Sequence, residues 1–547
     1  MKLKHIFKIL LFFWVAVPNS FGQTPKLTIV LVVDQFAYHY FQRLSPYFTH
    51  GLKLLQENGV NFQNAHHPHA APTTATGHVT LSTGALAKDH GVILNSWSES
   101  GIHRKFSSDD SPQAAELTKN GTADYGHSAH QIMTDTISDQ FIINSRPDDA
   151  NYVYSLSLKS RAAIGMAGKM GKAVWFDNDQ GKFTSSKAYF EKWPSWLTKF
   201  NKENNLKKLT EIDWTLSYPP NSEPYKFFNI QNYKHSKSQN RLAGQLIKIN
   251  GDKDFSIFQK TPYGNELLLS MGRQLIDTNI EKINTGKMLL WISLSSLDKI
   301  GHDFGPYSME VIDMVYNLDM QLEPFIHHAQ DQFGAENVLF VLTADHGVAP
   351  IQEILEDEGF AIPSRVDSKK LTADMNAHVK EKFEIDNIIQ EFRTNQFYFN
   401  KEALTGVDKK QRKEICSSLQ EFLSTYPAIK CSWTHDELVK TKFSKNHYEQ
   451  LFKNQLYPGR SGDLVVMSQP YCTIIKHSKG ATHRSPYEYD THVPLIFYQE
   501  GVLSNKAVLR KVLATQIAPS LAKILHVPAP ATASNKVLPE LFEVAAN

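Results

Sequence analysis

Acidic and imidazole side chains follow several apolar runs of the chain, at the points where buried strands should end. Asp34 follows the run LTIVLVV, Asp298 follows MLLWISLSSL, and Asp345 follows VLFVLTA. In an open parallel sheet, ligands gather outside the carboxyl ends of the strands, so these side chains should meet at one place. Together with three nearby histidines they form a set of three carboxylates and three imidazoles: Asp34, Asp298, His302, Asp345, His346 and His483.

Such a set suits two metal ions. Divided in two, each half is rich in Asp and His and leaves an open coordination position, which is typical of catalytic zinc. Each member alone has a simpler interpretation, because an Asp after a strand often caps a helix or turn and Asp298 could pair with His302 across one helical turn. Those interpretations would have to hold at three strand ends at once, which favours the metal pair. A second histidine cluster, His66, His67 and His69, has no carboxylate at a strand end, and we expect it on the surface or behind the ligands.

The segment PTTATGH, residues 72–78, offers a hydroxyl for such metals to activate. It connects a predicted strand, Gly59–Ala65, to a predicted helix, Val79–Leu86. A Thr at a helix start places its hydroxyl where backbone N–H groups and the helix dipole favour an anion. Metal coordination is one way to activate this weak nucleophile. From the segment alone, an ordinary helix N-cap is the simpler interpretation.

The order of motifs, VVDQ…PTTATGH…LDKIGHDFGP…TADHG…GATH…DTHVP, resembles the alkaline phosphatase superfamily over about residues 27–530. Within it, the sequence is most similar to the branch of nucleotide pyrophosphatase/phosphodiesterase-like enzymes with a Thr nucleophile, and there to exported, phosphate-irrepressible alkaline phosphatases of the PafA type. The resemblance implies two Zn²⁺ ions, one held by Asp34, Asp345 and His346 and the other by Asp298, His302 and His483. It also implies that Thr74, rather than Thr73 or Thr76, is the nucleophile and a ligand of the first metal.

The same resemblance assigns three residues to the phosphoryl group. Asn95, in LNSW, would donate a hydrogen bond to a phosphoryl oxygen, and Lys159 and Arg161, in SLKSRAA, would be its two cations. Residues i and i+2 of a strand lie on one face, so we expect both cations to reach one ligand. The charges of two Zn²⁺ ions, three carboxylates and a Thr74 alkoxide cancel. The two cations therefore match the two negative charges of a phosphate monoester, and Arg can hold two oxygens at once.

These residues predict a metal-dependent phosphomonoesterase, an alkaline phosphatase, that releases inorganic phosphate through a phospho-threonine intermediate. The alternative on the same scaffold is a phosphodiesterase or nucleotide pyrophosphatase, which would need an apolar or aromatic pocket for a second substituent. From a different class, the chain could be a non-catalytic metal- or phosphate-binding protein, but an intact nucleophile position with a full ligand set argues against it. We expect a monomer that acts on small-molecule phosphate monoesters and has no nucleic-acid scaffold role.

The elements that would position this site alternate between strand and helix, as in an α/β fold. Amphipathic stretches such as Tyr40–Asn58 and Met309–Phe333 separate short apolar runs, and Leu513–Leu525 has helical spacing. The runs read as buried parallel strands: Leu27–Val33, Val153–Leu158, Lys172–Phe176, Met288–Leu294, Val338–Leu342, Asp463–Met467 and Val493–Phe497. We expect an alkaline-phosphatase-like core of a mainly parallel sheet flanked by helices. Two polar intervals, about 177–265 and 355–460, lack this alternation and are predicted to be insertions that build a cap on one catalytic domain, residues 23–547.

The first 22 residues have the pattern of a signal peptide. Three lysines precede the apolar stretch Ile9–Val17, which is too short to span a bilayer, and Ser20 and Gly22 place small residues before a cut at Gln23. An uncleaved anchor is the alternative. We therefore expect a periplasmic or secreted protein with no membrane span after the leader is removed.

Composition excludes several classes of protein. The chain of 547 residues is 41% hydrophobic and 21% charged, which is typical of a globular protein. Its 58 Lys and Arg nearly balance 56 Asp and Glu, so charge gives no reason to expect nucleic acid or an anionic membrane as partner. The three cysteines, Cys416, Cys431 and Cys472, are too few for a disulfide framework, and the sequence does not say whether two of them pair.

Overall fold

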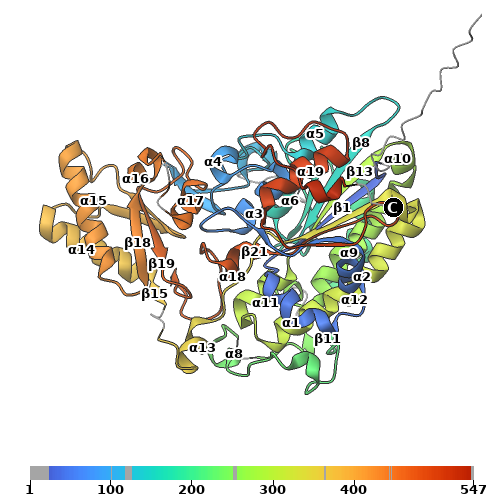
Figure 1. Cartoon of the computed structure of the whole chain (residues 1–547), viewed down its shortest axis with the longest axis horizontal. Coiled ribbons are helices and arrows are strands. Elements are labelled where there is room, and N and C mark those ends of the chain that lie inside the picture. The colour runs from blue at the N-terminus through green and yellow to red at the C-terminus, as the bar shows by residue number, and fades with distance from the viewer. Residues whose placement is uncertain are drawn as a thin grey trace, which may run out of the picture.

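A nine-stranded sheet, in the order β10-β9-β8-β13-β1-β14-β22-β2-β23, forms the centre of the molecule (Figure 1). The computed structural model describes residues 24–543 except 100–101, 118–125, 239, 250–254, 362–364, 443 and 445, so the predicted leader lies outside the described residues. Five neighbouring strands run parallel: β9 (Lys172–Asp177), β8 (Asn151–Ser157), β13 (Lys287–Leu294), β1 (Leu27–Val33) and β14 (Val338–Thr343). These strands confirm five of the predicted runs and the predicted α/β class with a mainly parallel sheet.

Helices cover both faces of this sheet, which explains why its strands are apolar along their whole length. Along β1, Leu27, Ile29 and Leu31 join the hydrophobic cluster on one face, and Val30 and Val32 join the cluster on the other. The first face is covered by α2 (Gly51–Asn58), α9 (Pro262–Thr278) and α12 (Met309–Phe333). The second is covered by α3 (Thr74–Thr83), α5 (Ile137–Ile143), α6 (Ser160–Ala167) and α19 (Ile517–Ile524).

Two predicted parallel strands have a different place. The run at 493–497 forms β22 (Leu495–Tyr498) in the central sheet, but it pairs antiparallel with both β14 and β2 (Val60–Phe62). The run at 463–467 forms β19 (Leu464–Ser468) in a separate antiparallel sheet. Both predictions of direction are wrong because a continuous apolar run reports burial on two faces and carries no information on strand direction.

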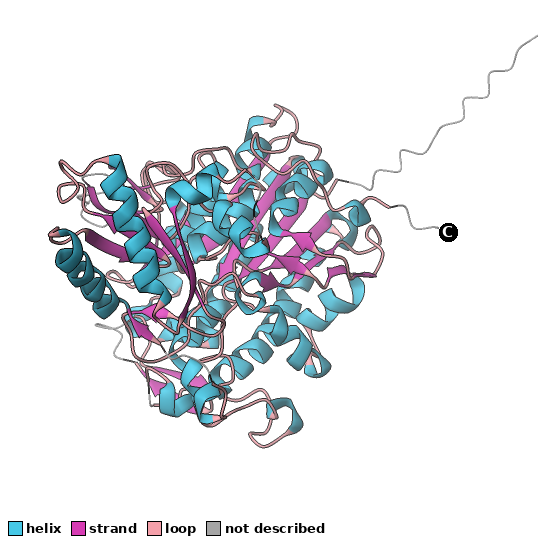
Figure 2. Cartoon of the chain, turned by 60° about the vertical axis from the view of Figure 1, so that its left-hand side comes forward, coloured by secondary structure: helices cyan, strands magenta, loops and turns pink. Residues whose placement is uncertain are grey.

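The second sheet lies at one end of the molecule, at the left of Figure 1. Its strands, in spatial order, are β16 (Ile389–Arg393), β17 (Gln396–Phe399), β19 and β18 (Ile429–Thr434). Figure 2 shows α14 (Ser368–Phe383) and α15 (Lys409–Ser424) packed against one side of it. A separate hydrophobic cluster that includes Leu371, Phe397 and Leu419 fills the space between them. Most of the predicted insertion 355–460 therefore has a small core of its own.

The interval 177–265 packs on the main core instead. It contains β10 (Lys182–Thr184), α7 (Ser195–Glu203), β11 (Glu211–Trp214), α8 (Asn232–His235) and β12 (Gln245–Lys248). Trp196 and Trp214 belong to the same hydrophobic cluster as Leu27, and the Trp214 indole donates a hydrogen bond to Asp313 Oδ2 of α12 at 2.6 Å. Its aromatic residues therefore extend the core of the central sheet.

The predicted helices differ mainly at their ends. Met309–Phe333 is α12 as expected, whereas the stretch 40–58 divides into α1 (Tyr38–Leu44), a 3₁₀ turn at Ser45–Tyr47 and α2. The break contains Pro46, which has no N–H to continue a helical hydrogen-bond ladder. At the C-terminal end, Leu513 belongs to a short strand, β24 (Val512–Leu513), so the helix starts later than predicted, as α19.

No disulfide joins any of the three cysteines in the structure. Within the described residues, no helix has the length and apolarity needed to cross a membrane.

Candidate active site

Three adjacent central strands deliver the predicted acidic residues to one edge of the sheet. Asp34 follows β1 directly, and Asp345 lies two residues after the end of β14. Asp298 lies in the first turn of α11 (Ser296–Phe304), which follows β13. The six predicted donors form two groups whose ligand atoms lie within 4.8 Å of one another. We call Asp34, Asp345 and His346 the closed cluster, and Asp298, His302 and His483 the open cluster.

The closed cluster is sealed from solvent, and its donor atoms converge. The side chains of all three residues are 0% exposed. His346 Nε2 lies 3.5 Å from Asp34 Oδ1 and 3.3 Å from Asp345 Oδ2. None of these three atoms has a hydrogen-bond partner among the described residues, although His78 Nδ1 lies 3.3 Å from Asp345 Oδ2. Buried polar atoms are nearly always satisfied, so three converging lone-pair donors without partners fit a bound cation.

The open cluster has the same donor chemistry but reaches solvent. His302 Nε2 lies 3.2 Å from Asp298 Oδ1, and His483 Nε2 lies 3.9 Å from the same oxygen. The His302 side chain is 25% exposed, whereas Asp298 and His483 are 6% and 2% exposed. An ion in this group would therefore lie nearer the entrance of the site.

Backbone carbonyls fix the orientation of all three histidines. The Nδ1 atoms of His302, His346 and His483 lie 2.9–3.0 Å from the carbonyl oxygens of Ala481, Gly347 and Pro72, respectively. A ring that donates from Nδ1 keeps its Nε2 lone pair free, which is the form a metal ligand needs. Burial, with the neighbouring His346 and His302, also holds the pKa of His483 well below its ordinary value, so the ring stays neutral.

Gln35 connects the two clusters, a role that was not predicted although the residue directly follows Asp34. Its backbone N–H donates to Asp345 Oδ1 at 3.1 Å, and its side-chain Nε2 donates to Asp298 Oδ1 at 2.8 Å. Its φ of 70° is unusual for a residue with a side chain. A Cβ on Gly301 would lie 2.0 Å from Gln35 Oε1, so a glycine is needed there for Gln35 to fit.

The three carboxylates cannot all be charged without cations beside them. Burial, and then the charges of Asp298 and Asp345, raise the pKa of Asp34 well above its ordinary value. Burial has the same tendency at Asp298, but Lys159 and His302 overcome it and hold the pKa of Asp298 well below its usual range. The site therefore requires positive charge, and the chain itself supplies one part of it through Lys159.

Lys159 lies between the two clusters. Its ammonium forms ion pairs with Asp34 at 2.5 Å and with Asp298, and it lies 3.5 Å from Thr74 Oγ1. The prediction that Lys159 and Arg161 lie on a strand is wrong, because β8 ends at Ser157 and the two residues lie at the start of α6. The strand stops there because the Ser157 hydroxyl accepts from the Lys159 N–H at 3.0 Å and the chain turns into the helix. Arg161 Nε is buried and has no hydrogen-bond partner in the described part of the chain.

Thr74 is the first residue of α3, as a nucleophile at a helix start requires. The hydroxyls of the alternatives Thr73 and Thr76 lie 3.1 Å apart and form a hydrogen bond with each other, whereas Thr74 Oγ1 points to Lys159. A Cβ on Gly77 would lie 2.2 Å from the Asp345 carbonyl oxygen, so this helix packs directly on the strand end that carries the closed cluster. The first turn of α3, which carries Thr74 and is called the Thr74 turn below, therefore lies beside the closed cluster.

Two further residues, one predicted and one not, also lie at this turn. Asn95 Oδ1 accepts from the Ala75 N–H at 2.8 Å, which places the Asn95 amide next to Thr74. His78, one turn along α3, joins its ring to the Thr74 carbonyl at 2.7 Å and to the Ser293 hydroxyl at 2.9 Å. His78 was not predicted to have a role, although it lies within the PTTATGH motif.

The second histidine cluster is buried rather than on the surface. His66, His67 and His69 are 3%, 1% and 0% exposed. His67 Nε2 lies 2.8 Å from the carbonyl oxygen of Ala344, directly before Asp345, so it supports the closed cluster from behind. His69 accepts a hydrogen bond from the Ala87 N–H at 3.0 Å and has a structural role.

Known proteins share both this sequence pattern and this fold. Residues 28–493 match the sequence model of the family described as type I phosphodiesterase / nucleotide pyrophosphatase. The chain belongs to that family. Among relatives, it is 28% identical over 535 residues to alkaline phosphatase PafA of Elizabethkingia meningoseptica, covering 95% of this chain and 94% of that enzyme. It is also 28% identical over 552 residues to alkaline phosphatase PhoV of Synechococcus elongatus, covering 96% and 95% of the two chains.

The fold is that of the PafA enzyme. The crystal structure of wild-type alkaline phosphatase PafA superposes with a TM-score of 0.84 and 26% identity, over 95% of this chain and 99% of that one. The central sheet and the smaller second sheet together are therefore part of one shared architecture.

Two more cations of this family member lie near the site and escaped the sequence analysis. Lys299 directly follows Asp298, and burial, with the charges of Lys159 and Arg161, lowers the pKa of Lys299 to about 8. Arg484 directly follows His483, and its charge interacts with Asp298 and Arg161. Single basic residues beside ligands carry no spacing signal, so only the three-dimensional arrangement reveals them.

Proposed function

We propose that the protein is an exported, two-zinc phosphomonoesterase, an alkaline phosphatase, that works through a phospho-threonine intermediate. The observation that carries the proposal is the position of Lys159, whose ammonium contacts both clusters and lies 3.5 Å from Thr74 Oγ1. A nucleophile, a cation and two sets of lone-pair donors thus meet at one point. The similarity to enzymes named alkaline phosphatase supports the same activity.

The two clusters would each hold one metal ion. Asp34, Asp345, His346 and Thr74 would bind the first, and Asp298, His302 and His483 the second. Mixed carboxylate and imidazole donors with an open position suit Zn²⁺. Bound there, zinc would favour the ionised form of the Thr74 hydroxyl and would neutralise charge on the oxygen that leaves.

The residues of the chain then have separate tasks. Thr74 attacks phosphorus in line with the leaving oxygen, so the phosphoryl group passes to Oγ1 and the alcohol departs on the opposite side. Lys159 and Arg161 would hold non-bridging oxygens of the phosphoryl group, with Asn95 as a third donor. A water that attacks from the side the alcohol has left then releases inorganic phosphate and regenerates Thr74.

The charges of the site favour a monoester over a diester. Lys159 and Arg161 match the two negative charges of a monoester dianion, and the buried Arg161 Nε has no hydrogen-bond partner among the described residues. A diester carries one charge and has less need of both cations. The phosphodiesterase alternative remains the rival, since the matching family is named for that activity.

Two further parts of the proposal concern location and access. Removal of residues 1–22 as a signal peptide would deliver the enzyme to the periplasm or the medium. The insertions would act as a cap, and a contact supports this for the second: Ser98, near the site loop of Asn95, forms a hydrogen bond with Glu391 of β16.

Rates on three chromogenic esters test the proposal. Zinc-reconstituted protein should hydrolyse 4-nitrophenyl phosphate faster than methyl 4-nitrophenyl phosphate and 4-nitrophenyl sulfate. Chelation should abolish the activity, and Zn²⁺ should restore it. Faster hydrolysis of the diester would favour the phosphodiesterase, and no hydrolysis by zinc-loaded protein would favour a non-catalytic binding protein.

A further inference from the structure

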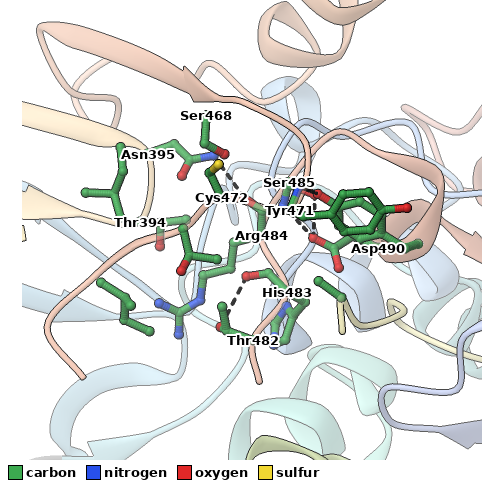
Figure 3. A pocket seen from close by; sticks show the side chains of 15 residues that line it. Thr394, Asn395, Ser468, Tyr471, Cys472, Thr482, His483, Arg484, Ser485 and Asp490 are labelled. Atoms are coloured by element: carbon green, nitrogen blue, oxygen red, sulfur yellow. Dashed lines mark hydrogen bonds between the residues drawn. The ribbon is translucent and has the colours of Figure 1, made fainter. Parts of the chain in front are cut away.

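Arg484 is a partly buried cation beside the open cluster that forms no salt bridge with a described carboxylate. Its Nε atom is sealed from solvent and has no hydrogen-bond partner, and among the described residues no carboxylate lies within salt-bridge distance of its guanidinium. Asp490, the acidic residue of the same loop, accepts instead from the Ser485 N–H at 2.8 Å and the Ser485 hydroxyl at 2.6 Å. In Figure 3 the Arg484 guanidinium extends to the side of the loop away from the Asp490 carboxylate.

Two other enclosed arginines of this chain have their partners within the protein. Arg460 donates to the carbonyl oxygens of Gly91 and Gln131 at 2.7 and 2.8 Å. Arg365 forms an ion pair with Glu353 at 2.8 Å. Because removing an unpaired charge from water is costly, the isolated guanidinium of Arg484 calls for an anion from outside the chain.

The backbone at Arg484 is also strained. Its φ is 107°, in the region that favours glycine, so a residue with a side chain strains the backbone there. The conformation is held in part by the second sheet, since Asn395 Nδ2 donates to the Arg484 carbonyl at 2.9 Å. The chain thus keeps a large basic side chain where a glycine would be easier to place.

The neighbours of Arg484 show which part of a substrate it faces. Its charge interacts with Asp298 of the open cluster and with Arg161, and more weakly with Asp490 and Arg104. Burial, together with the two arginines, lowers the pKa of Arg484. The Thr74 turn packs on the closed cluster, through the Gly77 contact with Asp345. In an in-line reaction the leaving oxygen lies opposite the nucleophile, which is the side of the open cluster. Arg484 therefore lies on the leaving-group side.

We infer that Arg484 binds a second anionic group, a carboxylate or a phosphate, carried by the leaving group of the substrate. The inference rests on the proposed function and narrows its substrate class to phosphate monoesters with an additional negative charge. Lys159 and Arg161 match the reacting dianion, so the charge of Arg484 is surplus for a simple monoester. An arginine suits this task because its planar fork binds carboxylate and phosphate in the same way.

The test is a selectivity ratio measured on zinc-loaded protein. The kcat/KM for 3-carboxyphenyl phosphate is divided by that for phenyl phosphate, and the kcat/KM for propane-1,3-diyl bisphosphate by that for 3-hydroxypropyl phosphate. Arg484→Met keeps the apolar stem but removes the charge, and Arg484→Lys keeps the charge but removes the fork. Lys476→Met, an exposed residue of the same segment, is the matched control for one lost charge.

In Arg484→Met, at least one ratio should fall about tenfold, mainly through a change in KM. The fall should be smaller in Arg484→Lys, and Lys476→Met should leave both ratios unchanged. The ratio that falls identifies carboxylate or phosphate as the second group. Equal losses on charged and uncharged leaving groups, or an equal fall in the Lys476 control, would overturn the inference. Zinc content and melting temperature of each variant show whether the loop still folds. A wild-type enzyme inactive on phenyl and 3-hydroxypropyl phosphate would instead contradict the proposed function.

Discussion

The two donor clusters contain the same kinds of side chain but differ in access to solvent. The closed cluster is completely buried between the ends of β1 and β14, whereas the open cluster exposes a quarter of the His302 side chain. The start of α3 packs on the closed cluster, and a loop that also contacts the second sheet carries His483 of the open cluster. From this difference we expect the two clusters to have different roles. The nucleophile would act at the closed cluster, and the leaving group, water and product would exchange at the open cluster.

The largest effect is expected at the nucleophile on the sealed side. Thr74→Ala removes the attacking oxygen, so turnover of an aryl phosphate should fall by about 10³-fold or more. Thr73→Ala is the matched control, and it should have a much smaller effect because its hydroxyl is bonded to Thr76. The comparison would break if acid-quenched enzyme yielded a phosphorylated peptide that carries phosphate on Thr73.

Metal release should separate the two clusters. Because solvent reaches only the open cluster, a chelator should remove one equivalent of zinc quickly and the second slowly. In His302→Ala, the affinity of the open cluster for zinc should be about 10–100-fold weaker, so the fast equivalent is lost and the slow one is kept. In His346→Ala, the closed cluster should be weakened instead, so the slow equivalent is lost. Zinc content against time in the chelator measures both. Release of the two equivalents at one common rate would show that the difference in exposure has no functional meaning.

The smallest effect is expected at Asp490, which supports the loop of His483, and it concerns the stability of the fold. Burial raises the pKa of Asp490 to about 7, above the ordinary value for an aspartate, so the folded state binds this proton more tightly than the unfolded state. The protonated Asp490 therefore stabilises the folded state at low pH. This stabilisation should be lost as pH rises from about 4 to about 7, which lowers the free energy of unfolding by at most about 1.4 kcal/mol per pH unit.

Asp490→Asn should remove this slope, whereas the exposed control Asp179→Asn should retain it. Urea unfolding of wild type and both variants at several pH values measures the difference. An unchanged slope in Asp490→Asn would mean that another group near the loop takes up the proton.

The sequence predicts the closed side of the site better than the open side. Asp34 and Asp345 each follow an apolar run that becomes a parallel strand, so the rule for strand ends brings them together without further information. His483 lies in a loop far along the chain, and only the family resemblance assigns it to the open cluster. Gln35 ends the VVDQ motif and Arg484 follows GATH, but the role of neither residue could be predicted, because it depends on distances across elements that are hundreds of residues apart.

The fold shows the same limit. Apolar runs predict five parallel strands because burial on both faces leaves a direct mark on composition. Apolar composition cannot show that β19 belongs to the second sheet or that β22 runs antiparallel to its neighbours. Strand direction and sheet membership follow from long-range pairing, which the local sequence does not encode.

The proposed preference of the enzyme for a dianion depends on Lys159 and Arg161, and these two residues allow the most direct measurement of it. The quantity is kcat/KM for 4-nitrophenyl phosphate and for methyl 4-nitrophenyl phosphate, in wild type and in Lys159→Ala/Arg161→Ala. Lys207→Ala/Lys208→Ala, which removes two exposed charges, is the control, and zinc content is measured in each variant. The monoester should lose roughly ten- to a hundredfold per cation and the diester much less. Equal losses on both esters, with zinc retained, would contradict the account and favour the phosphodiesterase.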